Sequence, residues 1–244
     1  MCSVAKTAYT LGEEPDQSPI NNNKPLFVFA AKLYRIAAER GNARGQYNLG
    51  VCYRDGIGIK KDEVEAFNWM LKAAEQGDSR AQCVLGGFYL FGEGVEIDKT
   101  EAFNWFKKSA EQGFPGGEFT FGSCFLLGYG VKEDKTEAVK WFHKAADQGL
   151  AEAQFFLGQC YIEGNGVETD MKEGVYWYRK AAKQGMAEAQ FWLGYYLVRG
   201  EGEINDPKEA VKWFRKAAEQ GVADAQYYLG HCYYNGNGIK KRQY

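Results

Sequence analysis

The sequence is short of the residues that build most catalytic and metal-binding sites. Only 2 of its 244 residues are histidines, His143 and His231, which nearly excludes a metal site made of several imidazoles. Its formal net charge is −2, so no basic excess draws it to nucleic acid or to an anionic membrane surface. We therefore expect no nucleic-acid partner, no membrane partner, no metal and no cofactor.

Long apolar runs are also missing. A membrane-spanning helix needs about 18 consecutive apolar residues, and the sequence has no such stretch. The first 24 residues, MCSVAKTAYTLGEEPDQSPINNNK, lack the basic start and the apolar run of a signal peptide. We expect a cytoplasmic protein, unless the chain is a fragment that has lost its leader.

What the sequence does contain is a fixed period. Glycine, of which the chain has 30, recurs in three series of positions, and tryptophan recurs in a fourth; within each series the positions are 36 residues apart. The glycines of the first series follow Leu or Phe, those of the second open each Gly-x-Gly, and those of the third end each repeat. The first of these comprises Gly50, Gly86, Gly122, Gly158, Gly194 and Gly230. Such self-similarity predicts a repeat architecture over residues 27–244.

Each repeat is predicted to hold two helices. The first runs from Ala153 to Glu163 in the fourth repeat, where small residues let a partner helix approach closely. The second begins at an aspartate such as Asp134, three residues before a glutamate, which predicts a capping box: the glutamate reaches back to the cap. A glycine such as Gly149 ends it in the left-handed conformation. The stretch from Gly128 to Gly149 is therefore scaffold and not a phosphate loop, which needs Gly-x4-Gly-Lys-Ser/Thr after a strand.

These residues resemble the SEL-1-like repeat (SLR) family, a relative of the tetratricopeptide repeats. Residues 153–185, AQFFLGQCYIEGNGVETDMKEGVYWYRKAAKQG, match the family pattern at nearly every position, with Gly174 where alanine is usual. The resemblance implies an all-α fold, a right-handed α-solenoid of 36-residue helix-turn-helix repeats whose first helices line a concave face. It also implies an adaptor or scaffold role in protein complexes. Some secreted bacterial members have been described as weak β-lactamases, and those carry a cysteine pair inside each repeat.

The repeat boundaries divide the chain. We expect residues 1–25 to form a polar N-terminal segment, with a decayed first helix as an open alternative, and residues 26–244 to form the solenoid. The solenoid comprises a half repeat at 26–44, five full repeats at 45–224 and a partial repeat at 225–244. Since solenoids need polar caps, either the sixth first helix caps the array or the chain is cut from a longer one.

The cysteines and His143 are predicted to be structural. Cys52, Cys124, Cys160 and Cys232 share one repeat position, so no repeat holds a pair, and small buried thiols in a reducing compartment are expected. His143 has mostly lysine and arginine at the equivalent positions of other repeats, which predicts that it faces water. No Ser-His-Asp or Cys-His set can be assembled, so we expect no catalytic residues and no enzyme activity.

Function is expected where the repeats differ from one another. Three variable columns of the first helices are spaced three and four residues apart, so they share one helix face, which we expect to be the concave groove. Aromatic residues concentrate there in the last three repeats, and Trp and Tyr often anchor protein interfaces. The predicted partner face comprises Phe156, Gln159, Glu163, Trp192, Tyr195, Arg199, Tyr228 and His231.

The sequence thus predicts a non-enzymatic scaffold or adaptor that binds a peptide or protein segment. Two alternatives stay open: a weak β-lactamase-type hydrolase, by family analogy, and a repeat segment of a larger signalling protein. The identity of the partner and the oligomeric state are not predicted, and a monomer is compatible with every feature above.

Overall fold

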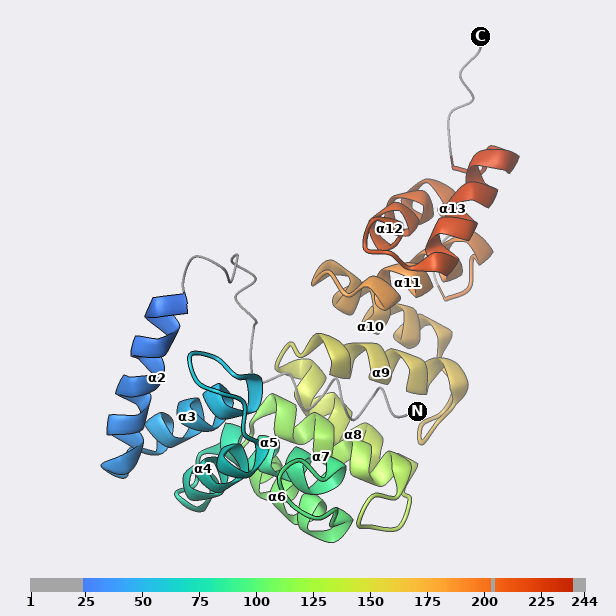
Figure 1. The fold of residues 1–244 in the computed structure, drawn as a ribbon. Helices are drawn as coiled ribbons and strands as arrows, with labels where there is room; N and C mark the ends of the chain where they lie inside the picture. The colour runs from blue at the N-terminus through green and yellow to red at the C-terminus, as the bar shows by residue number, and fades with distance from the viewer. Residues whose placement is uncertain (1–23, 203–204, 239–244) are drawn as a thin grey trace. The chain divides into compact units, whose positions relative to one another are not determined.

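The computed structural model describes residues 24–202 and 205–238, which form 12 helices and no strand (Figure 1). The predicted polar N-terminal segment lies almost wholly outside these ranges. The chain divides into two compact units, Met1–Asp134 and Lys135–Tyr244. The all-α repeat fold expected from the sequence is confirmed in both.

Each unit is a series of helices joined by short loops. The described helices of the first unit are α2 (Lys24–Glu39), α3 (Ala43–Asp55), α4 (Glu63–Glu75), α5 (Ser79–Phe91), α6 (Lys99–Glu111) and α7 (Pro115–Leu127). Those of the second are α8 (Lys135–Asp147), α9 (Ala151–Glu163), α10 (Met171–Lys183), α11 (Ala187–Arg199), α12 (Pro207–Glu219) and α13 (Ala223–Asn235). The odd-numbered helices are the first helices of the repeats, and the even-numbered helices are the second helices. The first helix of the fourth repeat, α9, begins two residues earlier than the sequence predicted.

Aspartates cap α4, α6, α10 and α12 as expected, but the predicted capping box is wrong. The Asp62 carboxylate accepts the amides of Val64 and Glu65, both at 3.1 Å. The Asp62 amide, however, already donates to the Tyr53 carbonyl of the preceding helix at 2.9 Å, so the Glu65 side chain has no cap amide to reach. Glu65 Oε2 instead accepts the indole N–H of Trp69 at 3.1 Å, one turn further along the helix.

The two glycines of each Gly-x-Gly loop have different roles. Gly128 ends α7 in the left-handed conformation, with φ of +66°, and its amide donates to the Cys124 carbonyl. Gly130 also has a positive φ, and a Cβ on it would lie 2.1 Å from the carbonyl oxygen of Lys99, at the start of α6 in the preceding repeat. The second glycine is therefore the place where two consecutive repeats meet backbone to backbone.

Buried glutamines tie consecutive repeats together, a role that we did not predict. Gln190 is 3 % exposed, and its side-chain amide donates to the Ala182 carbonyl at 3.2 Å. Its side-chain oxygen accepts from Gln220, which follows the second helix of the same repeat, at 2.9 Å, whereas Ala182 belongs to the preceding repeat. The same two bonds recur at Gln46, Gln82 and Gln154.

The repeated lysine and tryptophan form pairs on the second helices. The Nζ of Lys144 lies 3.5 Å from the ring centroid of Trp141, and four other repeats hold the same pair at 3.6 to 4.6 Å. Contacts of this kind are worth about 0.5–1 kcal/mol at exposed sites. The repeated lysines thus pack against the tryptophans, and their positive charge near the helix C-terminus also interacts favourably with the helix dipole.

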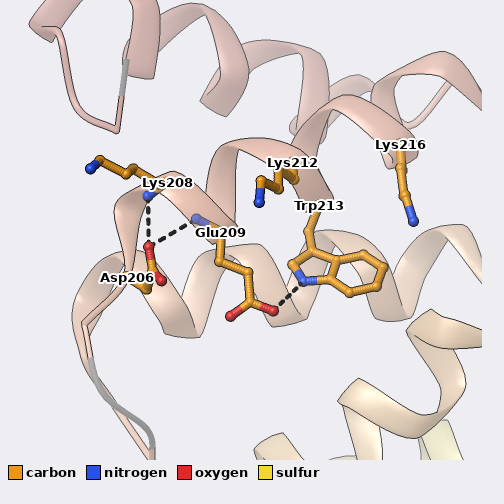
Figure 2. A pocket seen from close by; sticks show the side chains of 6 residues that line it. All are labelled: Asp206, Lys208, Glu209, Lys212, Trp213 and Lys216. Atoms are coloured by element: carbon orange, nitrogen blue, oxygen red, sulfur yellow. Dashed lines mark hydrogen bonds between the residues drawn. The ribbon is translucent and has the colours of Figure 1, made fainter. Parts of the chain in front are cut away.

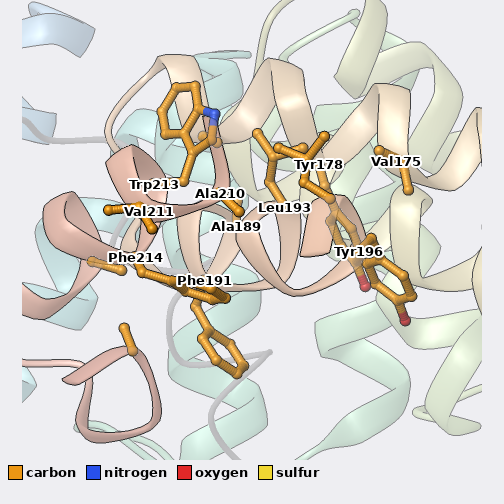
Figure 3. Close-up of a cluster of buried hydrophobic side chains, with 14 of the residues drawn as sticks. Val175, Tyr178, Ala189, Phe191, Leu193, Tyr196, Ala210, Val211, Trp213 and Phe214 are labelled. Carbon is orange, nitrogen blue, oxygen red and sulfur yellow. The ribbon is translucent and has the colours of Figure 1, made fainter. Parts of the chain in front are cut away.

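The core of the second unit lies between its first and second helices. Val175, Leu193 and Phe214 are completely buried there, and aromatic rings fill much of the space (Figure 3). None of the helices in the described ranges combines the length and the apolar character that a membrane span requires.

Candidate functional site

The residues of the predicted partner face come from α9, α11 and α13. Each of these helices begins at an alanine, has 13 residues and ends at a left-handed glycine. Residues that stand 36 apart therefore occupy the same turn of successive first helices, and residues three or four apart stack along one helix. This register places Trp192 and Tyr195 on one helix and Tyr228 at the matching turn of the next.

The structure brings three of the predicted residues into contact, and we call Trp192, Tyr195 and Tyr228 the aromatic patch. The ring centroids of Trp192 and Tyr195 are 5.6 Å apart, and those of Tyr195 and Tyr228 are 5.7 Å apart, both nearly perpendicular. All three side chains are half-buried. Phe191 lies next to all three rings, at 5.1 to 6.3 Å, and is itself buried.

Each outer ring of the aromatic patch also stacks on the core. Trp192 lies over Tyr196 at 6.1 Å with an interplanar angle of 28°, and Tyr228 lies over Phe214 at 5.6 Å and 23°. Figure 3 shows Phe191, Tyr196 and Phe214 in the cluster beneath. One part of each ring therefore packs the interior while another part reaches the surface, so the patch is held rigidly.

Phe156 belongs to an earlier part of the array. It lies against Phe155 on its own helix, at 5.5 Å, and against Phe142 of α8, at 6.3 Å. Phe142 is completely buried, so Phe156 continues the core outward in the same way as the aromatic patch does.

The polar members of the predicted face are bound to close neighbours. Gln159 donates to Glu163 at 2.9 Å, and Glu163 also accepts from Asn165 at 2.6 Å. Arg199 pairs with Glu201 in its own loop.

Arg199 and His231 flank the aromatic residues. The hydrogen bond that Arg199 donates to the Glu201 carboxylate raises the pKa of the exposed Arg199 guanidinium, which also lies 5.2 Å from the Tyr195 ring centroid. His231 is exposed, and one ring nitrogen lies 3.0 Å from the side-chain amide of Asn235. A cation beside Tyr195 and an exposed imidazole near Tyr228 add polar groups to an otherwise apolar surface.

His143 does not face water as the sequence predicted. It is half-buried, with Nε2 3.0 Å from the Tyr161 hydroxyl, and its ring lies edge-on to Tyr161 at 5.8 Å and to Trp177 at 5.9 Å. The matching Arg35 and Arg215 also donate to a tyrosine 18 residues further on. At these three positions the side chain therefore joins its repeat to the first helix of the next one.

The described cysteines are buried and free, as predicted. Burial raises the pKa of the Cys83, Cys124 and Cys160 thiols to about 12, so almost no thiolate forms near neutral pH. Within the described ranges, no group of three or more His, Cys, Asp or Glu side chains is arranged to hold a metal ion.

A pocket of about 480 Å³ lies along α12 (Figure 2). Several of its lining residues already have structural partners. Asp206 caps the helix, Glu209 accepts the Trp213 indole N–H at 3.1 Å and pairs with Arg179, and Lys216 lies over the Trp213 ring. The pocket is a surface feature of the repeated Glu-Trp-Lys set and adds no candidate chemistry.

Comparison with known proteins identifies the repeat. A profile of the Sel1 repeat matches residues 19–42, 43–78, 79–114, 122–150, 151–186, 187–222 and 223–243. No protein with a curated description matches the chain.

Solved structures with the same fold are similar to the chain over most of its length. A protective antigen present in uropathogenic Escherichia coli strains is 40 % identical with a TM-score of 0.81, over 86 % of this chain and 45 % of that protein. A Sel1 repeat protein from Oxalobacter formigenes is 36 % identical with a TM-score of 0.78, over 82 % of this chain and 59 % of that one. An immunity protein from Pseudomonas aeruginosa, 19 % identical with a TM-score of 0.57 over 89 % and 81 %, shares the fold alone. The chain thus spans about half the length of its two more similar relatives.

Sel1 repeats are typically a non-catalytic scaffold fold, and proteins built from them generally mediate protein–protein interactions. The 36-residue register, the left-handed glycines and the profile matches from residue 19 to residue 243 agree. The chain belongs to the Sel1 repeat family.

Proposed function

We propose that this chain is a non-catalytic adaptor that binds a peptide or protein segment over the first helices of its second unit, with the aromatic patch as the anchor. The observation that carries the proposal is the contact between Trp192, Tyr195 and Tyr228, half-buried rings from α11 and α13, the first helices of two successive repeats. Large rings that are fixed before binding lose little conformational entropy when a partner covers them.

The composition of the face supports a protein partner. Trp, Tyr and Arg are the residue types in which binding energy concentrates at protein interfaces, and here Arg199 lies over Tyr195. Glu163 and His231 add polar groups beside the rings, which resembles an apolar centre with a polar rim. Gln159 and Phe156 extend the face to α9, so a bound segment would run across α9, α11 and α13, the first helices of three successive repeats.

A catalytic role is not part of the proposal. The three cysteines whose thiol pKa is raised to about 12 are poor nucleophiles, because the thiolate is the reactive form. The β-lactamase-type alternative is tested by incubating the purified chain with a chromogenic β-lactam. We expect no turnover above that of buffer, and hydrolysis that persists through purification would overturn this part of the proposal.

The binding site is tested by substitution within the patch. The variant carries Trp192→Ala, Tyr195→Ala and Tyr228→Ala, and the control carries Tyr129→Ala and Tyr176→Ala, which remove partly exposed tyrosines from other surfaces. Both are used as bait in affinity capture from a lysate of the source organism. We expect the patch variant to lose the proteins that the wild type and the control retain.

Folding must be checked because the patch rings also pack the core. Helical content from circular dichroism should match between the variant and the control. A milder variant, Tyr195→Ser alone, keeps the stacks on Tyr196 and Phe214 and should still weaken capture. Unchanged capture by the folded triple variant would show that the partner binds elsewhere.

A further inference from the structure

Basic side chains concentrate on two second helices of the second unit. Helix α10 has four basic and one acidic residue, and α12 has four basic and two acidic residues. Both arginines are engaged, because Arg179 pairs with Glu209 and Arg215 donates to the Tyr233 hydroxyl at 3.0 Å. Five of the six remaining lysines share one face, and we call them the lysine face: Lys172, Lys180, Lys208, Lys212 and Lys216.

The repeat register arranges the lysine face in two rows. Lys208, Lys212 and Lys216 are four residues apart, so they lie on successive turns of one side of α12 (Figure 2). Lys172 and Lys180 stand 36 residues before the outer two, at the same turns of α10. The ion pair between the second helices of these two repeats shows that α10 and α12 lie side by side.

Nearby carboxylates are mostly engaged elsewhere. Those of Asp170 and Asp206 each accept two backbone amides at the start of their helices, and Glu209 is paired with Arg179. Among the residues that the structure describes, no acidic side chain forms a salt bridge with Lys208 or Lys212. The lysine face therefore keeps an excess of positive charge, although the whole chain carries a formal charge of −2.

The positive charge is specific to these repeats, whereas the exposure is general. Helix α6 of the first unit holds Thr100, Asn104 and Lys108 at the positions of the three α12 lysines, and all three are exposed. The last of these positions is a lysine in every second helix from α4 to α12, where it lies over a tryptophan. Lys208 and Lys212 thus replace the neutral Thr100 and Asn104 at positions that face solvent throughout the array.

We propose that the lysine face binds an extended acidic segment of a partner protein, at a surface separate from the aromatic patch. The three α12 lysines line the pocket along that helix together with Trp213, so a chain segment can lie beside them. Successive lysines are about 6 Å apart along the helix axis. Carboxylates on alternate residues of an extended chain are about 7 Å apart, so one can meet each lysine.

The pocket favours a polypeptide over a nucleic acid or a membrane. Asp206 and Glu209 line the same pocket, and they would repel an unbroken row of phosphates. A polypeptide can place neutral residues opposite these two carboxylates. A lipid bilayer presents a broad surface that does not enter a recess along one helix.

The test measures peptide binding to the full chain by fluorescence anisotropy at low ionic strength. The probe is a fluorescein-labelled peptide with three glutamates that alternate with serine, and the reference peptide has glutamine in place of glutamate. The variant carries Lys208→Glu and Lys212→Glu. The control carries Lys60→Glu and Lys132→Glu, which change the net charge equally at exposed loop positions of the first unit.

We expect the wild type and the control to bind the glutamate peptide equally, and added salt to weaken both. The Kd of the variant should rise by about tenfold or more, because like charges then face each other. The milder Lys208→Gln with Lys212→Gln should raise it less, and neither change should alter helical content. The triple variant of the aromatic patch should bind like the wild type, so this inference and the proposed function can fail separately.

Three results would overturn the inference. A wild type that shows no saturable binding at low salt, or that binds the glutamine peptide equally well, would exclude an acidic segment as the ligand. Equal weakening in the variant and the control would show a response to overall charge and not to this face. Displacement of the peptide by an equal charge of single-stranded DNA or of phosphatidylserine vesicles, with tighter binding than the peptide, would assign the face to a nucleic acid or to a membrane.

Discussion

Alanine at Gly130 should destabilise the fold far more than alanine at Gly128, although both glycines lie in one loop with nearly the same backbone conformation. Their φ angles are +68° and +66°. A left-handed conformation costs an alanine about 1–2 kcal/mol, and the stiffer unfolded chain offsets about 0.4–1 kcal/mol of this. Gly128→Ala has 3.5 Å to its nearest neighbour atom, so it should lose only the difference, about 1 kcal/mol.

Gly130→Ala bears the same backbone term and a collision with the preceding repeat. Its Cβ would lie 2.1 Å from the Lys99 carbonyl oxygen, so α6 and the loop must separate by about 1 Å. Overpacking of this kind costs about 1–3 kcal/mol, and a backbone atom yields less readily than a side chain. The total loss should therefore be about 2–4 kcal/mol.

Urea unfolding followed by circular dichroism measures both variants. Repeat arrays can unfold in more than one step, so the transition of the first unit should be compared with that of the second. Equal losses for Gly128→Ala and Gly130→Ala would instead show that the second glycine serves only the turn and not the approach of the neighbouring repeat.

Other predictions follow from the joints between repeats and from the thiols. Gln190→Ala should lower the free energy of unfolding by about 1–3 kcal/mol, because it removes two hydrogen bonds worth about 0.5–1.5 kcal/mol each, one to the Ala182 carbonyl and one from Gln220, and Gln190→Glu should not restore it in urea unfolding. Arg179 donates to Glu209 and thereby lowers the pKa of the Glu209 carboxyl. The stability that this pair contributes is therefore fully present above the ordinary pKa of a glutamate and is lost as the pH falls through the lowered pKa of the folded state. The gap in urea midpoint between the wild type and Arg179→Ala should therefore shrink in acid, and a constant gap would contradict this. In a Cys2→Ser variant, thiol reagents should label the native chain slowly and the urea-unfolded chain fast; rapid native labelling would contradict the burial of the thiols.

The helices could be predicted from sequence because their ends depend on neighbouring residues along the chain. Asp62 caps the first turn of its own helix, and Gly128 needs only a left-handed φ, so both appear in the residue pattern. The direction of the Glu65 side chain was not predictable in this way. It depends on the Tyr53 carbonyl of the previous helix, which has already taken the cap amide.

Contacts between repeats were harder to predict than contacts within them. His143 resembles a surface residue when its column is read alone, because lysine and arginine share that position. Its hydrogen bond to Tyr161 and its contact with Trp177 depend on the next repeat. The column of buried glutamines holds glutamine in every repeat except one, which has Glu118, and it could have been recognised as structural for that reason.

The packing of the side chains on the predicted partner face could be predicted in part. The 36-residue register was enough to predict that Trp192, Tyr195 and Tyr228 would meet. It could not predict how much of each ring packs on Tyr196 and Phe214, because that depends on the separation of the helices. It also missed the local partners of Arg199 and Glu163, which lie in the loops.

Site-specific photocrosslinking tests the central claim that partners bind at the aromatic patch. A photoreactive phenylalanine analogue replaces Tyr195 in the full chain, and the same analogue at Tyr129 provides the control. After illumination in a lysate of the source organism, we expect a covalent adduct to a specific protein from position 195 and none from position 129. Adducts from position 129 alone, or equal adducts from both, would contradict it.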